Sequence, residues 1–172
     1  MYAVLAPGAD FARWRDLARS LVLRGIPPEQ VDWLVENPTG RDPRPLPPPL
    51  PPPPPVSDPV FTVPAGFLDL AGAAVLHRDH ARFTLLYRLL WRLRARPALI
   101  TRTGDADVAT LHRLAAAVRR DQRRMTAGLR FREIGRERSS RFVAWFEPQH
   151  HILEATAPFF ERRYADMAWS IL

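Results

Sequence analysis

The chain of 172 residues contains no cysteine, and all 25 of its basic residues are arginine. The lack of cysteine excludes disulfides, thiolate nucleophiles, iron–sulfur clusters and cysteine-ligated zinc from these residues. Long apolar runs are also missing: residues 67–76 include Asp69 and fall far short of the roughly 20 residues of a membrane helix. No basic, signal-like segment opens the chain. We therefore expect a soluble cytoplasmic protein with no membrane partner, no metal and no cofactor.

The positive charge is concentrated in one part of the chain. The formal net charge is +7, but residues 78–141 alone hold 17 arginines against six acids, a net of +11. The segments on either side are each slightly acidic. Guanidinium groups bind phosphate through two parallel hydrogen bonds and stack on bases. This basic segment predicts a polyanionic partner, most simply DNA.

The pattern of apolar residues predicts a helix-rich α+β fold with a small, mostly antiparallel sheet. Expected helices cover residues 11–24, 64–76, 80–96 and 106–127, and a further helix opened by Pro148 is kinked or restarted by Pro158. Expected strands cover residues 2–5, 31–35, 129–134, 142–147 and 169–172. The strand at 142–147 is apolar on both faces, so we expect it to be central in its sheet. All five tryptophans lie in apolar patterns and are expected in the core.

A proline-rich segment divides the chain. Residues 38–59 contain 12 prolines, which favour an extended polyproline II conformation. We interpret it as a linker or loop insertion between an N-terminal strand–helix–strand part, residues 1–37, and a helical and hairpin main part, residues 60–172. A ligand for an SH3-like groove is the alternative interpretation of this segment.

Several short blocks of the sequence resemble one known family. The blocks are Phe67-Leu68-Asp69-Leu70, His77-Arg78-Asp79, the apolar run 85–93, Trp145-Phe146-Glu147-Pro148-Gln149-His150-His151-Ile152, Ala157-Pro158-Phe159-Phe160 and Trp169-Ser170-Ile171-Leu172. Together they are similar to an uncharacterised bacterial family of DNA metabolism or repair proteins. The resemblance covers nearly all of the chain outside the proline-rich segment, and the Glu-Pro-x-His-His and Ala-Pro-Phe-Phe blocks are its most specific parts.

The resemblance also implies partner proteins with a role in DNA repair. Members of the family stand beside a DNA-repair radical-SAM protein or form the N-terminal part of fusions to a uracil-DNA glycosylase of the X subclass. The proline-rich segment departs from the family pattern, and the family continues beyond the position of Leu172. We therefore expect a C-terminally truncated member or a fragment of a longer fusion. The family supplies no catalytic residues, and no glycosylase chemistry is assigned to this chain.

Arginines on the helix at 106–127 and the following strand are the expected contacts to nucleic acid. They are Arg113, Arg119, Arg120, Arg123 and Arg124 on the helix, with Arg130 and Arg132 on the strand. Several cations on one face release counterions from a phosphate backbone, whatever its base sequence. A solvated face in an arginine-rich protein is the alternative. Arg88 and Arg92 form the polar stripe of an otherwise apolar helix, so we expect a structural role or a pocket for them.

Glu147, His150 and His151 are the candidate catalytic residues. A carboxylate at a strand end followed by two histidines can serve acid–base chemistry or hold a metal. Adjacent helical residues point about 100° apart, which argues against one metal shared by the two histidines. His77, Asp79 and His80 form a second polar cluster that Glu147 would complete as a three-ligand site. In both places, helix capping and packing are the simpler interpretations.

Two classes of function follow from these patterns. The first is a DNA-repair accessory domain that binds nucleic acid through the arginine-rich helix and strand and works with a glycosylase or radical-SAM partner. The second is an enzyme that acts on nucleic acid through Glu147 with His150 or His151. A protein scaffold whose arginines meet an acidic partner is a third.

Overall fold

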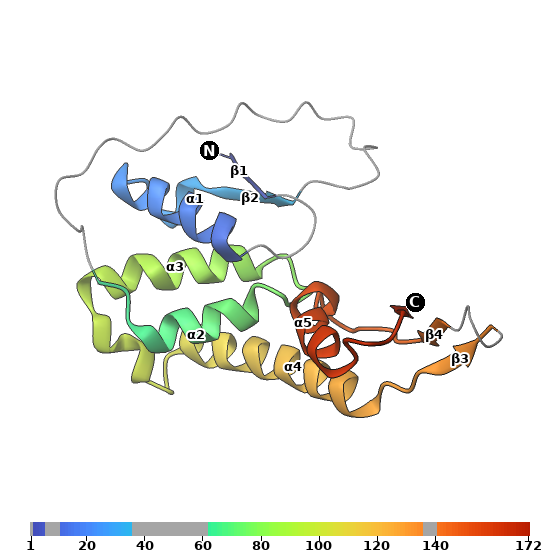
Figure 1. Cartoon of the computed structure of the whole chain (residues 1–172). Coiled ribbons are helices and arrows are strands. Elements are labelled where there is room, and N and C mark those ends of the chain that lie inside the picture. Colours follow the sequence, from blue (N-terminus) through green and yellow to red (C-terminus); the bar gives the residue numbers. More distant parts are fainter. Residues whose placement is uncertain (1, 6–10, 36–61, 136–140) are drawn as a thin grey trace.

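The computed structural model of the chain describes residues 2–5, 11–35, 62–135 and 141–172 (Figure 1). The expected polyproline linker at residues 38–59 and most of the turn after residue 135 lie outside these ranges. Five α-helices are present in the described parts: α1 (Phe11–Leu23), α2 (Ala65–Ala74), α3 (Arg82–Ala95), α4 (Ala106–Gly128) and α5 (Leu153–Arg163). Two small sheets accompany them. The helix-rich α+β class is confirmed.

The first sheet is a parallel pair, β1 (Tyr2–Leu5) and β2 (Asp32–Val35), in which Ala3 lies opposite Trp33. Helix α1 connects the two strands, and Gly25 ends it as expected. This glycine has φ +66°, a left-handed conformation that only glycine adopts readily. Its N–H donates to Val22 O and the next N–H donates to Leu21 O, which closes the last turn of the helix.

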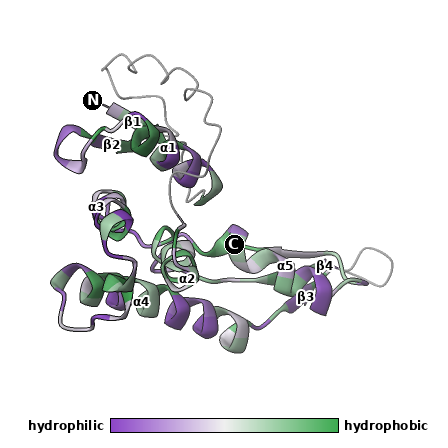
Figure 2. Cartoon of the chain, turned by 90° about the vertical axis from the view of Figure 1, so that its left-hand side faces the viewer, coloured by the Kyte–Doolittle hydropathy of each residue, from purple (hydrophilic) through white to green (hydrophobic). Residues whose placement is uncertain are grey.

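The helices are stacked beneath this sheet. Figures 1 and 2 show α1 and the first sheet lying over α3, with α2 and α4 below it. The larger hydrophobic cluster runs through all of these elements, from Ala3 and Trp14 through Phe67 and Leu86 to Leu111. The N-terminal strand–helix–strand part therefore shares its core with the main part.

The second sheet has the order β3 (Arg132–Ile134), β4 (Arg141–Ala144) and β5 (Trp169–Ile171). The prediction of a central strand after residue 141 is confirmed. β3 pairs with β4 in the antiparallel sense, but β5 pairs with β4 in the parallel sense. Since the first sheet is also parallel, the prediction of a mostly antiparallel sheet is wrong. The parallel pairing arises because α5 carries the chain back to the start of the sheet before β5 begins.

A smaller hydrophobic cluster joins the second sheet to the helices. It contains Val118 and Met125 from α4, Ala144 from β4 and Phe160 from α5. Phe131 packs its ring edge against Tyr164 at a centroid distance of 5.1 Å. Helix α4 therefore contributes side chains to both hydrophobic clusters.

Two sequence predictions about this region are wrong. Pro148 does not open a helix, because residues 148–152 form a loop and α5 begins at Leu153 and runs through Pro158. Trp145 does not pack in the core, since 76% of it is exposed.

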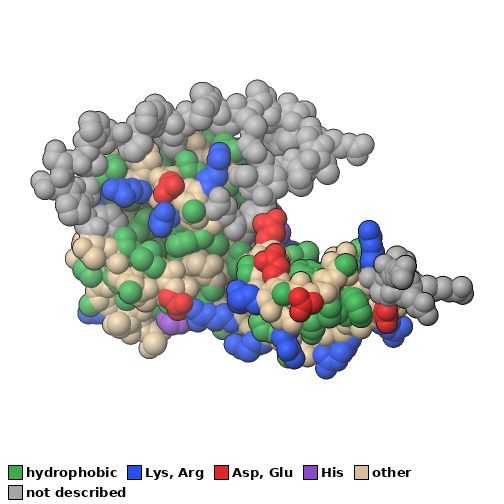
Figure 3. All heavy atoms as spheres, in the orientation of Figure 1, with side chains coloured by type: hydrophobic (Ala, Val, Ile, Leu, Met, Phe, Trp, Pro, Cys, Tyr) green, Lys and Arg blue, Asp and Glu red, His purple; other side chains and the backbone are tan. Residues whose placement is uncertain are grey.

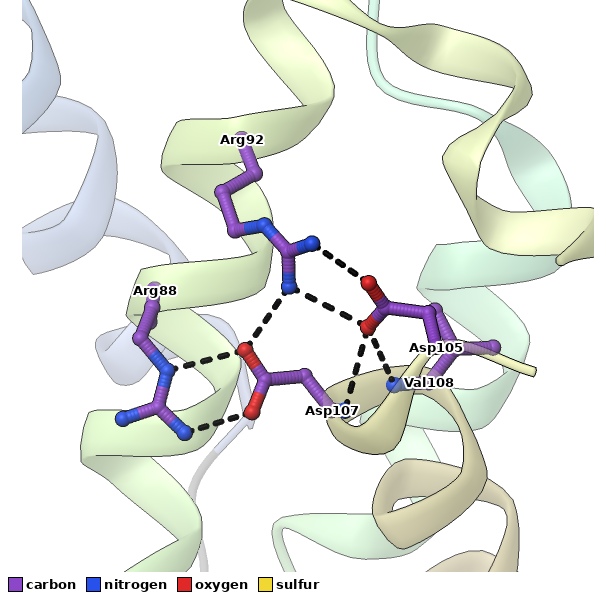
Figure 4. Close-up of polar contacts among 5 residues, drawn as sticks. All are labelled: Arg88, Arg92, Asp105, Asp107 and Val108. Atoms are coloured by element: carbon purple, nitrogen blue, oxygen red, sulfur yellow. Dashed lines mark hydrogen bonds and ion pairs between the residues drawn. The ribbon is translucent and has the colours of Figure 1, made fainter. Parts of the chain in front are cut away.

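An ion-pair cluster fixes α3 against the start of α4 (Figure 4). Arg88 donates two hydrogen bonds to Asp107, at 2.9 and 2.6 Å. Arg92 binds both Asp105 and Asp107, so the two guanidinium groups share one carboxylate. Asp105 also caps α4 by accepting from Asp107 N and Val108 N. Arg88 and Arg92 thus have a structural role.

Candidate nucleic-acid interface

Helix α4 presents its arginines in two stripes on the side away from the core. Residues at a spacing of seven or eleven point in nearly the same direction on a helix, which places Arg113, Arg120 and Arg124 in one line. Arg119 and Arg123, four apart, form a second line on the neighbouring side. Figure 3 shows arginines along the lower edge of the molecule, from α4 towards β3, and Figure 2 shows hydrophilic turns on the outward side of α4. We call these five residues the basic face.

Some of the predicted arginines already have partners within the protein. Arg119 Nη2 lies 2.7 Å from Asp69 Oδ2 on α2. Arg124 Nη2 lies 2.8 Å from both Asp121 Oδ1 and the carbonyl oxygen of Glu147. Arg130 precedes β3 and donates to the carbonyl oxygens of residues 127 and 129, at the end of α4. These contacts give the three arginines a structural role and reduce their freedom to bind an external anion.

The remaining predicted arginines are open to solvent. Arg113, Arg120, Arg123 and Arg132 are exposed, and none of their guanidinium groups makes a hydrogen bond or ion pair with another residue in the described part of the chain. Uncompensated guanidinium groups on one side of a helix attract phosphate groups. These four arginines are therefore the best-placed anion contacts on this side of α4.

A buried carboxylate fixes the loop next to the basic face. Only 3% of Asp121 is exposed, although it lies in the most basic part of α4. Its Oδ2 accepts hydrogen bonds from the backbone N–H groups of Gln149 and His150, at 2.8 and 3.0 Å. Its Oδ1 is held by Arg124 through the ion pair described above. The carboxylate thus accepts hydrogen bonds from two backbone N–H groups and also forms an ion pair with one guanidinium group.

The same loop docks on the segment between α2 and α3. His151 N donates to Leu76 O at 2.9 Å, and Arg78 Nη2 donates to Pro148 O at 3.1 Å. The rings of His77 and His150 are in contact, with centroids 4.2 Å apart. His77, Arg78, His150 and His151 therefore meet, and we call this group the histidine junction.

The histidine junction favours neutral imidazoles. Partial burial and the proximity of His150 lower the pKa of His77. Partial burial also lowers the pKa of His150, and Arg78 and Arg120 lower it further while Asp121 opposes them. The pKa of His151 is lowered by burial and by Arg82 and Arg78. A protonated ring would be poorly solvated at these partly buried positions, and neighbouring positive charges would repel it.

Arg82 is the most deeply buried of the arginines near these histidines. Only 1% of it is exposed, and its Nε and Nη1 donate to the carbonyl oxygens of Val75 and Asp79 at 2.7 and 2.9 Å. Burial lowers the pKa of its guanidinium to about 10. The guanidinium lies over the ring of Phe83, 4.0 Å from the centroid. Arg82 therefore shapes the turn that carries His77 and Arg78.

The candidate catalytic residues are only partly brought together. His150 and His151 line a pocket of about 480 Å³ with Arg78 and the first turn of α5, including Glu154. Glu147 is exposed, and it uses its backbone carbonyl, rather than its carboxylate, to contact Arg124. No hydrogen bond in the described structure joins the Glu147 carboxylate to either histidine. An acid–base pair between Glu147 and a histidine is not assembled in this conformation.

The second predicted polar cluster is organised locally. Asp79 Oδ1 accepts from Ala81 N, and His77 Nδ1 accepts from Asp79 N, so these side chains shape the turn before α3. Within residues 2–5, 11–35, 62–135 and 141–172, no group of three or more His, Asp or Glu side chains is arranged to hold a metal ion. Glu147 does not complete the expected three-ligand site.

Sequence reasoning missed two residues that the structure makes prominent. Asp121 is one of the six acids of the basic segment 78–141, and an acid bordering the core side of a basic helix is a signal of a buried partner. Trp145 alternates with Ala144 and Phe146 along the strand, and this places it on the opposite side of the sheet from the small core. Because the strand is apolar on both faces, no local signal distinguishes the exposed side from the buried one.

Comparisons with known proteins give a family without a function. None of the described helices combines the length and apolarity needed to cross a membrane. Searches of curated proteins and of solved structures found no match. Residues 80–172, which include α3, α4, the second sheet and α5, match the model of a domain of unknown function, DUF4130. This match extends over more than half of the chain, and the protein therefore belongs to the DUF4130 family.

Proposed function

We propose that this protein binds nucleic acid through the basic face of α4, continued by Arg132, and serves as an accessory domain in DNA repair. The observation that carries the proposal is the set of exposed arginines on α4 that lack an acidic partner in the described structure: Arg113, Arg120 and Arg123. Acids on α4 do not offset them, because Asp107 and Asp121 are engaged elsewhere.

The dimensions of the basic face suit a phosphate backbone. Arg113 and Arg124 are separated by eleven residues, or about 16 Å along the helix axis. Phosphates along one strand of B-DNA follow each other at intervals of roughly 3.4 Å along the duplex axis. The face therefore spans several consecutive phosphates, and contact with them requires no particular base sequence.

The repair setting comes from the family resemblance in the sequence. That resemblance favours a radical-SAM repair protein or a uracil-DNA glycosylase, separate or fused, as the working partner. In this arrangement the domain holds the DNA and the partner performs the chemistry.

The direct test is DNA binding across a salt series with the triple variant Arg113→Gln/Arg120→Gln/Arg123→Gln. Each lost phosphate contact lowers the slope of log affinity against log salt by about 0.9 for B-DNA. We expect the slope to fall by roughly 2 to 3 and the affinity at low salt to fall strongly. Fluorescence anisotropy with labelled duplex and single-stranded DNA gives both quantities, and DNA containing uracil tests a preference for damage.

A matched control removes equal charge elsewhere. Arg94, Arg96 and Arg102 are exposed beyond the basic face, and their triple substitution by Gln also lowers the net charge by three. Equal losses in the two triple variants would show a nonspecific charge effect and contradict the proposal. A failure of DNA and RNA to bind at low salt would instead favour an acidic protein partner.

An enzyme acting on nucleic acid is the second candidate function. The favouring observation is the pocket of about 480 Å³ lined by His150 and His151, whose lowered pKa values suit imidazoles that accept a proton. In this alternative, Glu147 joins one histidine once substrate is bound. Glu147→Gln and His150→Asn should then abolish turnover of a nucleic-acid substrate while binding persists, whereas an accessory domain has no turnover to lose.

A further inference from the structure

The outer face of the second sheet, which points away from the small core, lies open in the described structure. Side chains alternate along β4 and the two residues that follow it, so Ala144 and Phe146 enter the small core and Val143 and Trp145 point to the other side. The register adds side chains from β3 and β5, because Val143 lies between Arg132 and Ser170. We define the outer face by these residues: Arg132, Ile134, Arg141, Val143, Trp145 and Ser170.

Trp145 dominates this face. It is 76% exposed, whereas Trp14 is fully buried and Trp33, Trp91 and Trp169 are half-buried. Its strand position is fixed, because Leu172 N donates to Ala144 O and Phe146 N donates to Leu172 O, both at 2.9 Å. A large aromatic ring on this hydrogen-bonded backbone offers a flat binding surface.

The charge of the outer face indicates what would cover it. Arg132 and Arg141 stand on the face, and neither guanidinium group makes an ion pair or hydrogen bond with another residue in the part of the chain that the structure describes. Glu133 is paired with Phe142 in the register, so it belongs to the opposite side of the sheet. The outer face therefore combines cations with an aromatic ring and carries no acidic side chain among its described members.

We propose that this outer face binds single-stranded nucleic acid, with one unpaired base stacked on Trp145 and neighbouring phosphates held by Arg132 and Arg141. Stacking on an aromatic ring requires an unstacked base, which a closed duplex does not offer. Arg132 belongs both to this face and to the continuation of the basic face. The inference rests on the proposed function and deepens it, because it assigns strand preference to a surface separate from α4.

The experiment compares the affinity of a short oligothymidylate strand with that of a blunt duplex for four proteins. They are the wild type, Trp145→Ala, Trp145→Phe and the control Phe159→Ala, which removes an exposed aromatic ring from α5 on the other side of the sheet. Trp145→Ala should weaken single-strand binding roughly 5- to 150-fold, the loss associated with one base–aromatic stack. Duplex affinity should change less than about twofold, and Trp145→Phe should recover most of the single-strand affinity.

The outcomes separate this inference from the proposed function. If the triple variant on α4 loses duplex binding while Trp145→Ala keeps full single-strand affinity, the outer face plays no part in binding and only this inference fails. If no variant and no wild-type protein binds DNA, both fail. If analytical ultracentrifugation shows a dimer that Trp145→Ala dissociates, the face is an interface between two copies and the inference is overturned. The exposed position of Trp145 allows the alanine variant to fold, which an unchanged melting temperature verifies.

Discussion

The carboxylate of Asp121, in the middle of α4, accepts a hydrogen bond from the backbone N–H of Gln149 at 2.8 Å. This contact crosses 28 positions in the sequence and holds the Glu-Pro-Gln-His-His segment against the basic helix. Residues 148–152 form a loop tied to α4 by this carboxylate, and α5 begins only at Leu153.

Replacing Asp121 should destabilise the protein more than replacing any surface acid. Asp121→Ala leaves two backbone donors without their acceptor and Arg124 without its ion-pair partner, and we expect the free energy of unfolding to fall by about 2 to 3 kcal/mol. Asp121→Asn keeps one acceptor oxygen and should cost about 1 kcal/mol. Urea unfolding followed by circular dichroism measures both values.

The control for this prediction is Asp69→Ala. Asp69 forms an ion pair with Arg119 on the surface, and such exposed pairs contribute less than about 1 kcal/mol. If Asp121→Ala were no more destabilising than Asp69→Ala, the assigned role of Asp121 would be wrong.

Substitutions of Asp105 should separate two contributions to stability at the start of α4. Its side chain caps the helix by accepting from Asp107 N and Val108 N, and it also binds Arg92. Asp105→Ala removes both contributions and should lower the free energy of unfolding by about 1 to 2 kcal/mol. Asp105→Ser retains the cap and loses the ion pair, so its cost should be about half as large. Thermal and urea unfolding report the difference, and equal costs for Ala and Ser would show that the cap contributes little.

The histidine junction should make stability depend on pH below neutrality. The pKa values of His77, His150 and His151 are lowered in the folded protein, mainly by burial. Between the folded and unfolded pKa values the unfolded chain binds more protons, so the free energy of unfolding falls as pH drops below about 6.5. The loss continues until pH passes below the folded pKa values.

A double variant tests this pH dependence. His77→Asn/His150→Asn removes the two contacting rings and should flatten the curve of unfolding free energy between pH 7.5 and 5. His112→Asn is a suitable control, because His112 is exposed on α4 and lies outside the histidine junction. An unchanged slope in the double variant would mean that other groups control the acid response.

Much of the helical structure was predictable because its signals are local. The expected helix at 106–127 matches α4 because Asp105 caps it and its apolar residues recur at helical spacing. Pro97 ends α3 as expected, and Gly25 ends α1. The central position of β4 followed from its two apolar faces.

The candidate site was less predictable because its geometry depends on long-range contacts. The sequence identified every arginine of the basic face, but not that Arg119 and Arg124 are bound by Asp69 and by Asp121 with Glu147. The meeting of His77 with His150 spans 73 positions in the sequence, and no local pattern contains it. The apolar character of Trp145 predicted burial, but the pattern of one strand does not tell whether another layer covers both faces of its sheet.

Helix α4 belongs to both hydrophobic clusters, with Leu111 and Leu114 in the larger and Val118 and Met125 in the smaller. If either half of the molecule unfolded, part of α4 would lose the side chains against which it packs. The two halves should therefore unfold as one cooperative unit. Any ligand that binds along the outward side of α4 would then stabilise both halves of the molecule. By binding one helix, it would raise the unfolding temperature of the N-terminal layers and of the distant second sheet together.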